Sequence, residues 1–313
     1  MTPNPSRSPI SSLARRFALG LAAVLALASC GGETQQIEPF VAKRYFAFGD
    51  EMSAFTADGR KYSINGLNVE TDAIDCTQSR IWIQYVAAIY KFGFAECPEG
   101  TGEQKAVSRA APGAKAADLV LQINAQVAAG GFEDRDLATV LIGTNDIKEI
   151  YESYGGGSTD AVVAEARRRG VRIGEQINRL VELGAKVIVS TTPDLGTTPY
   201  GLAQGSDGAK LLTRLSNELN GRVRVTFLND GRFVGLVSGD EWITAAVRFP
   251  DDYGLDNVSG AACNVALPDC TSETLVTGAT ADTWLWADDL WVASRAQRGL
   301  GQLAESRARD NPF

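Results

Sequence analysis

Histidine is absent from the 313 residues of this chain. It is the side chain that changes charge near neutral pH without a perturbing environment, and it is the usual base that activates a serine nucleophile. Cys-x-x-Cys pairs are also absent, so the usual ligand patterns of zinc sites are excluded. We therefore expect no metal ion, no other cofactor and no reaction that depends on a histidine base.

The first 29 residues contain no acidic side chain. Arg7, Arg15 and Arg16 precede an apolar stretch that runs from Phe17 to Ala28. This order is typical of a secretion signal, and the stretch is too short to span a bilayer comfortably. Residues 1–29 are therefore expected to be a signal peptide outside the fold.

Leu27-Ala28-Ser29-Cys30 resembles the bacterial lipobox, whose Cys is lipidated and becomes the first residue of the mature chain. The alternative is a plain small-residue cleavage site with an incidental Cys. Acyl chains on Cys30 would anchor the protein stably. Gly31 stands where Asp would retain such a lipoprotein in the inner membrane, which favours the outer membrane. We expect an exported protein, lipid-anchored in the bacterial envelope, with residues 30–42 as a polar tether.

Basic side chains are few relative to acidic ones. Without the leader, 27 Lys and Arg face 38 Asp and Glu, which gives a net charge of −11. Such a surface repels nucleic acid and anionic lipid headgroups. We expect no nucleic-acid partner, and a membrane contact through the N-terminal lipid anchor.

Four cysteines remain if Cys30 carries lipid, and an even number in an exported chain points to disulfides. Four cysteines allow three connectivities. We favour the local pairing, Cys76 with Cys97 and Cys263 with Cys270, in which each bond closes a loop rich in Gly, Pro, Asp and Thr. Each disulfide is expected to contribute about 2–3 kcal/mol by restricting the unfolded chain.

Short apolar segments alternate with amphipathic ones along residues 43–313, which indicates a single three-layer α/β/α domain with a mostly parallel sheet of about five strands. The region Gly231–Ala281 is less regular and is expected to be a loop-and-helix insertion covering one edge of the site. The expected strands are Arg44–Phe48, Ala106–Ala110, Leu137–Ile142, Val187–Thr191 and Val223–Leu228, and the expected helices are Ile81–Tyr90, Ala116–Ala128, Ala161–Leu183, Ala209–Asn220 and Ala293–Arg307.

Four short motifs occur in an order that resembles the GDSL lipase/esterase family, also called the SGNH hydrolases. They are the segments Tyr45–Glu51, Ala110–Ala114, Gly143–Asp146 and Trp286–Ala293. Each motif alone is weak, but their order and their positions after expected strands support the resemblance. The resemblance implies the fold described above and an ancestral hydrolase acting on ester bonds.

The resemblance also implies a role for each motif residue. Gly113 and Asn145 correspond to the two donors of the family's oxyanion hole, and Asp288 to the acid of its triad. Glu51 stands at the position of the nucleophilic Ser, and Trp291 at the position of the base His. The ordinary serine mechanism is therefore not expected here. Ser53 is a candidate substitute nucleophile, but a Ser at this second position is expected to be structural.

Glu51 would project toward the donors Gly113 and Asn145, and a carboxylate is a group that such donors hold well. We therefore expect Glu51 to fill its own oxyanion hole and Trp291 to act as an apolar plug. Trp284, Trp286 and Trp291 recur close together, either as core residues or as an aromatic platform for a sugar or acyl ligand.

The function expected from these residues is that of an envelope-anchored pseudoenzyme, which binds an acyl or carbohydrate ligand or serves as a scaffold for a protein partner. One alternative keeps catalysis, with the carboxylates Glu51 and Asp288 acting on an ester or glycosidic bond. Another places a hard cation such as Ca²⁺ among Asp50, Glu51 and Asp288.

Overall fold

The computed structural model describes residue 1 and residues 39–98, 102–228, 230–311 and 313. Residues 39–313 form one compact unit. Apart from Met1, the expected signal peptide lies outside the described residues, as does Cys30, the expected lipidation site. Within the described part of the chain, no helix is both long enough and apolar enough to cross a membrane.

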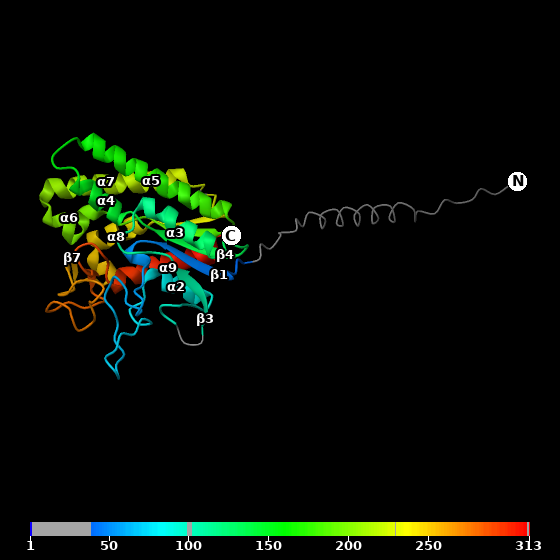
Figure 1. Cartoon of the computed structure of the whole chain (residues 1–313), viewed down its shortest axis with the longest axis horizontal. Helices are drawn as coiled ribbons and strands as arrows, with labels where there is room; N and C mark the ends of the chain where they lie inside the picture. Colours follow the sequence, from blue (N-terminus) through cyan, green and yellow to red (C-terminus); the bar gives the residue numbers. More distant parts are fainter. Residues whose placement is uncertain (2–38, 99–101, 229, 312) are drawn as a thin grey trace. The chain divides into compact units, whose positions relative to one another are not determined.

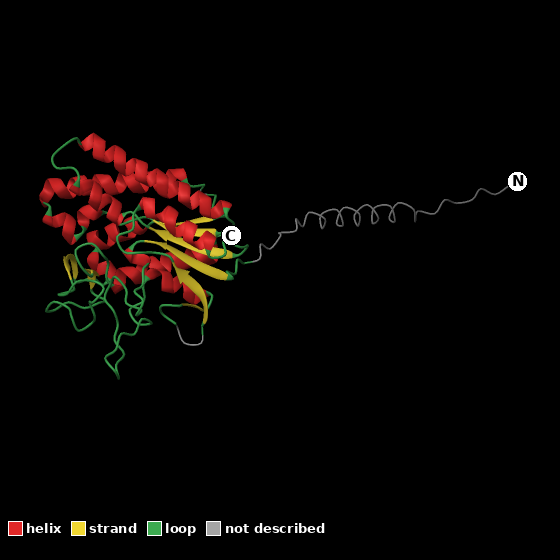
Figure 2. Ribbon diagram, in the orientation of Figure 1, coloured by secondary structure: helices red, strands yellow, loops and turns green. Residues whose placement is uncertain are grey.

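The centre of the domain is a sheet of six parallel strands, which confirms the predicted α/β/α class with one strand more than expected (Figure 2). The strand order is β2-β3-β1-β4-β5-β6. The strands are β1 (Arg44–Gly49), β2 (Phe92–Phe94), β3 (Glu103–Ser108), β4 (Asp136–Leu141), β5 (Lys186–Ser190) and β6 (Val234–Val237). Because all six run the same way, their carboxyl ends share one edge of the sheet, where sites of open α/β folds form.

Helices cover both faces of this sheet (Figure 1). One layer contains α3 (Ala116–Ala128), α4 (Thr144–Glu152), α5 (Thr159–Glu182), α6 (Pro199–Ala203) and α7 (Gly205–Thr226), and the other contains α2 (Trp82–Ile89), α8 (Gly239–Arg248) and α9 (Ser294–Asp310). Short 3₁₀ turns occur at η1 (Glu51–Ser53), η2 (Leu195–Thr197) and η3 (Pro250–Tyr253), and a small separate sheet pairs β7 (Asn257–Ala261) with β8 (Trp284–Trp286). All five helices expected from the sequence are present.

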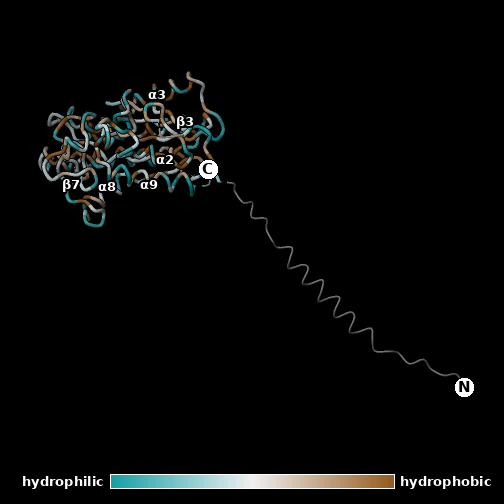
Figure 3. The backbone as a smooth tube through the Cα atoms, turned by 90° about the horizontal axis from the view of Figure 1, so that it is seen from below, coloured by the Kyte–Doolittle hydropathy of each residue, from teal (hydrophilic) through white to brown (hydrophobic). Residues whose placement is uncertain are grey.

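The hydrophobic core lies between the sheet and the helix layers, and Figure 3 shows apolar stretches running through the interior of the domain. Strands β4 and β5 are mostly apolar and almost wholly buried, because helices pack on both of their faces. The amphipathic helices complete the core with one apolar stripe each, as in α7, where Leu212, Leu215, Leu219 and Val223 are buried at helical spacing.

Three of the expected strands are correct, one is shifted and one is wrong. The segment Val223–Leu228 is not a strand, because its first residues form the last turn of α7. Its alternating β-branched residues favour a strand, but Val223 continues the buried stripe of the helix while Val225 is 72% exposed. Tertiary packing has overridden local β propensity here. The expected strand Ala106–Ala110 begins earlier, as β3 at Glu103.

The region Gly231–Ala281 is not only an insertion, since it contains the sixth strand of the main sheet. Strand β6 pairs in parallel with β5, with Val187 opposite Val234. A four-residue Val-Gly-Leu-Val segment is too short to show a period of its own, so the pairing that defines it could not be predicted from local sequence. Helix α8 and strand β7 make up much of the remainder.

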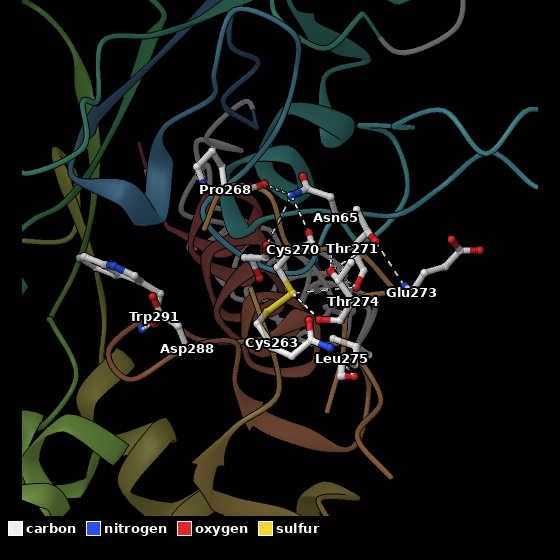
Figure 4. Close-up of a disulfide and its surroundings, with 12 residues drawn as sticks. Asn65, Cys263, Pro268, Cys270, Thr271, Glu273, Thr274, Leu275, Asp288 and Trp291 are labelled. Carbon is white, nitrogen blue, oxygen red and sulfur yellow. Dashed lines mark hydrogen bonds between the residues drawn. A yellow bond between two sulfur atoms is a disulfide. The ribbon is translucent and has the colours of Figure 1, made fainter. Parts of the chain in front are cut away.

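Two disulfides pair Cys76 with Cys97 and Cys263 with Cys270, as predicted. Figure 4 shows the second one beside Asn65, whose amide Nδ2 donates to the carbonyl oxygens of Pro268 at 2.8 Å and Cys270 at 3.0 Å. This contact connects the long loop after η1 to the loop that the Cys263–Cys270 disulfide closes.

Candidate functional site

The candidate site is built from loops that follow β1, β3 and β4 at the carboxyl edge of the sheet. Strand β1 ends at Gly49, whose φ of +140° is unfavourable for other residues. A Cβ at Gly49 would lie 1.9 Å from the carbonyl oxygen of Leu141, so only glycine lets the chain turn here beside β4. Gln122 holds the turn from α3: its Oε1 accepts from the Gly49 N–H at 2.9 Å and its Nε2 donates to the Gly49 carbonyl at 2.8 Å.

Glu51 begins the 3₁₀ turn η1 directly after this bend, and its side chain is held at both oxygens. Oε1 accepts a hydrogen bond of 2.8 Å from the backbone N–H of Gly113. Oε2 accepts a hydrogen bond of 2.8 Å from the side-chain Nδ2 of Asn145. Only 9% of the Glu51 surface is exposed, so both charge-assisted bonds are shielded from water, where such bonds are strongest.

The two donors are fixed relative to each other. Gly113 has φ +75°, a left-handed conformation that favours glycine and that directs its N–H toward Glu51. Asn145 lies in the first turn of α4, and its Nδ2 also donates to the carbonyl of Ala114 at 3.2 Å. One amide group therefore joins the loop after β3 to the helix after β4, with the Glu51 carboxylate between them.

Asp50 and Ser53 lie beside Glu51 but are wholly buried. Oδ1 of Asp50 accepts from the N–H of Met52 at 3.1 Å, while its Oδ2 has no hydrogen-bond partner. Burial is the main cause that raises the pKa of Asp50 well above its usual value, and the charge of Glu51 is the second cause. The raised pKa favours the neutral carboxylic acid. The hydroxyl of Ser53 accepts from the indole Nε1 of Trp82 at 3.1 Å. These contacts give both residues structural roles beneath the turn.

Asp288 and Trp291 lie together in a tight loop, to one side of the disulfide in Figure 4. Oδ1 of Asp288 accepts from the backbone N–H groups of Leu290 at 2.9 Å and Trp291 at 2.7 Å. Burial is the main cause that raises the pKa of Asp288 to about 6, with smaller contributions from the charges of Asp289 and Glu51. Trp291 is 6% exposed. The aspartate thus shapes its own loop.

A model of the family described as GDSL-like lipase/acylhydrolase matches residues 45–274, which is most of the chain. The chain belongs to this family. The match includes the segments of Glu51, Gly113 and Asn145, whereas Asp288 and Trp291 lie beyond it. Their correspondence to the acid and base of the family therefore rests on the sequence resemblance.

The solved structures that match this GDSL-like protein are distant from it in sequence. Phospholipase A1 from Streptomyces albidoflavus NA297 is 16% identical, with coverage of 85% of this chain and 100% of that one and a TM-score of 0.49. The extracellular lipase from Streptomyces rimosus is also 16% identical, with coverage of 85% and 99% and a TM-score of 0.47. The acetylxylan esterase Axe2 from Geobacillus stearothermophilus is 12% identical, with coverage of 86% and 95% and a TM-score of 0.46. No curated protein matches the chain.

The three tryptophans near the carboxyl edge do not form one exposed platform in this GDSL-like protein. Trp286 is fully buried, and its Nε1 donates to the carbonyl of Val258 at 2.9 Å. Trp291 is nearly buried, while Trp284 is partly exposed at the start of β8. At least Trp286 is therefore a core residue.

Two residues that support the GDSL-like site were given no role from the sequence. Asp146 follows Asn145 in α4, and it accepts from the N–H of Ala116 at 2.9 Å and from Arg169 at 3.1 Å. Burial is the main cause that raises its pKa to about 6. Gln122 is the other missed residue. A polar side chain on the mostly apolar stripe of α3 was the available signal, but its partner at Gly49 lies 73 residues away.

A cation site among the carboxylates receives no support from their arrangement. Within the described residues, no group of three or more His, Cys, Asp or Glu is placed to hold a metal ion. The three carboxylates have separate hydrogen-bond partners. Asp50 accepts from Met52, Glu51 accepts from the two donors, and Asp288 accepts from backbone N–H groups of its own loop. The geometry of the GDSL-like site favours a carboxylate that is hydrogen-bonded and closed in.

Proposed function

We propose that this protein is a pseudoenzyme of the GDSL/SGNH fold, anchored by lipid in the bacterial envelope, that binds a ligand or partner and lacks serine esterase activity. The observation that carries the proposal is the pair of 2.8 Å hydrogen bonds from Gly113 and Asn145 to the two oxygens of Glu51. In the family, the corresponding donors would stabilise the oxyanion of the reacting ester.

A bound carboxylate and a developing oxyanion compete for the same donors. Hydrogen bonds to a charged group are each worth about 1.5–3 kcal/mol, so an ester would have to displace two of them to reach the donors. Displacement alone would not restore the reaction, because the chain has no histidine to take a proton from a hydroxyl. The site is therefore filled and also lacks a base.

The envelope anchor and the ligand class are part of the same proposal. Cys30 in the lipobox-like segment would carry the acyl chains, and Gly31 favours the outer membrane. Two disulfides support export, because such bonds persist in oxidising compartments. An acyl or carbohydrate-containing ligand, or a protein partner, would use the surface around the filled site.

One observation favours a second candidate, a hydrolase that uses carboxylates. Burial is the main cause that raises the pKa of Asp288 to about 6, and the charge of Glu51 makes a smaller contribution; glycosidases likewise combine an acid of raised pKa with a carboxylate. Against this, both oxygens of Glu51 are already engaged by donors. An attacking or proton-accepting carboxylate would first have to leave them.

Hydrolysis of short-chain and long-chain p-nitrophenyl esters tests the proposal. The protein is compared with Glu51→Ser, Trp291→His and the double variant, and Glu51→Gln serves as the control that keeps the shape of the side chain. We expect background rates for all except the double variant, in which a nucleophile and a base are both restored. Wild-type turnover that disappears in Glu51→Gln, on these esters or on glycosides, would support the carboxylate hydrolase instead.

A further inference from the structure

The edge of the sheet opposite Glu51 has an unusual surface. We call this surface the amino edge, because its residues lie at the starts of the parallel strands or pack beside them. It comprises residues 39–43, 90–91, 127–135, 183–186, 225–228, 230–233, 307–311 and 313. The two ends of the described domain meet here, since the rings of Phe40 and Phe313 are 5.5 Å apart.

Large apolar side chains are exposed at the amino edge more than elsewhere. Apart from Met1, ten such side chains are exposed among the described residues, and five belong to this edge: Val41, Val127, Val225, Leu228 and Phe233. Val225 and Leu228 are the most exposed of the five, at 72% and 73%. A concentration of exposed apolar side chains on one edge is a feature of surfaces that contact another molecule or a membrane.

Cationic side chains accompany these apolar groups. Nζ of Lys186 lies 4.2 Å from the centre of the Phe233 ring, and the Arg232 guanidinium lies 5.8 Å from it. On the other side of the edge, Lys91 and Arg309 line a hollow of about 440 Å³ together with Phe40 and other apolar residues. Aromatic rings flanked by long basic side chains are typical of membrane–water interfaces.

Acidic residues are present at the amino edge, but two of them are paired with cations. Asp230 contacts Arg232 at 2.9 Å, and Glu133 contacts Arg44 at 3.5 Å. The mature chain as a whole carries a net charge of −11. Anionic headgroups would therefore repel much of its surface, whereas the amino edge combines local cations with exposed apolar groups.

The number of residues between Cys30 and the domain limits how far the amino edge can lie from a bilayer that holds a lipid on Cys30. Pro39 belongs to the amino edge, and Cys30 is nine residues before it. Nine residues span at most about 30 Å when fully extended. A lipid on Cys30 would keep the amino edge near the bilayer, whereas the strands separate that edge from Glu51 by about 20 Å.

We infer that the amino edge rests on the surface of the bilayer that holds the anchor, with Val225, Leu228 and Phe233 at the lipid interface. This inference rests on the lipid anchor of the proposed function. It has one consequence for that function: the Glu51 site faces the aqueous compartment. Its ligand then comes from solution or from another envelope structure, not from lipids of the membrane beneath.

A fluorescence experiment on the lipidated full chain tests the contact. An environment-sensitive thiol probe is placed at Leu228→Cys or, as the matched control, at Leu202→Cys. Leu202 is also an exposed leucine, 48% exposed, but it belongs to α6 near the carboxyl edge. The four native cysteines of the domain form disulfides, so the introduced thiol reacts alone once Cys30 is lipidated.

The labelled proteins are bound to vesicles of phosphatidylethanolamine and phosphatidylglycerol at three to one, with and without nitroxide-labelled lipid, and isolated by flotation. We expect a blue shift and at least twofold quenching at position 228, and neither at position 202. Flotation with equal signals at both positions, or a stronger signal at position 202, would overturn the membrane-facing edge and leave the anchor intact. Failure of the unlabelled protein to float would contradict the anchor and the inference together.

Discussion

Nδ2 of Asn145 donates a hydrogen bond of 2.8 Å to Oε2 of Glu51, across 94 residues of sequence. With the matching bond from Gly113, it engages both oxygens of the Glu51 carboxylate, which in the proposed function occupies the position that a reacting oxyanion would need. The GDSL-like fold is retained around this contact. Stability and the absence of turnover would then depend on the same side chain.

Glu51→Gln should destabilise the fold. The amide keeps one acceptor oxygen but turns an NH₂ group toward the remaining donor, so one hydrogen bond is lost and the other is weakened. We expect a loss of about 1–3 kcal/mol in the free energy of unfolding, measured by urea denaturation. Glu273→Gln, at an exposed glutamate, is the control and should change stability little. Equal effects of the two substitutions would show that the Glu51 contacts contribute nothing.

Asp288→Asn should flatten the pH dependence of stability. The pKa of Asp288 is raised to about 6, mainly by burial, so its folded form binds a proton more tightly than the unfolded chain. Its favourable contribution is complete below the usual pKa of Asp and is lost as pH rises toward 6. Asn keeps the Oδ1 acceptor and does not titrate. Between pH 4 and 6.5 the melting temperature of the variant should fall less than that of the wild type; parallel curves would contradict the assignment.

Gly49→Ala should be among the most damaging small substitutions in the chain. Its Cβ would lie 1.9 Å from the Leu141 carbonyl oxygen, and the backbone there cannot shift without separating β1 from β4. We expect a loss of at least about 3 kcal/mol or failure to fold. The matched control is Gly221→Ala in α7, where nothing lies within 4 Å of the new methyl group. That variant should be about 0.5–1 kcal/mol more stable than the wild type.

The two disulfides should differ in what they contribute. Cys76 and Cys97 are 21 residues apart, whereas Cys263 and Cys270 are seven apart. If restriction of the unfolded chain dominates, replacing the first pair with Ser should cost about 3 kcal/mol and the second about 2 kcal/mol. Chemical denaturation of the two double-serine variants measures this order. The reverse order would mean that native contacts of the shorter loop, such as those of Asn65, dominate.

Much of the fold was predictable because buried parallel strands and amphipathic helices leave clear local patterns. Helix α3 begins and ends where its periodicity indicates. Strand β6 was missed because a four-residue strand is defined by its pairing with β5, and the end of α7 was mistaken because β-branched residues there sit on a helical stripe. Local sequence contains neither relationship.

The candidate site was predictable for a different reason. Gly49-Asp50-Glu51, Gly113 and Asn145 follow strands whose carboxyl ends share an edge, so their proximity follows from topology. The supporting residues Gln122 and Asp146 were not predicted, because their partners come from other elements. The burial that raises the pKa of Asp288 also depends on packing that no short motif contains.

A covalent probe measures the central claim most directly. The unmutated protein is incubated with a fluorophosphonate and digested, and its peptides are searched by mass spectrometry for an adduct on any hydroxyl. The Glu51→Ser/Trp291→His variant is treated in parallel as the positive control. We predict labelling of the variant at position 51 and no adduct on the unmutated chain. An adduct on a Ser, Thr or Tyr hydroxyl beside Glu51 in the unmutated protein would contradict the account.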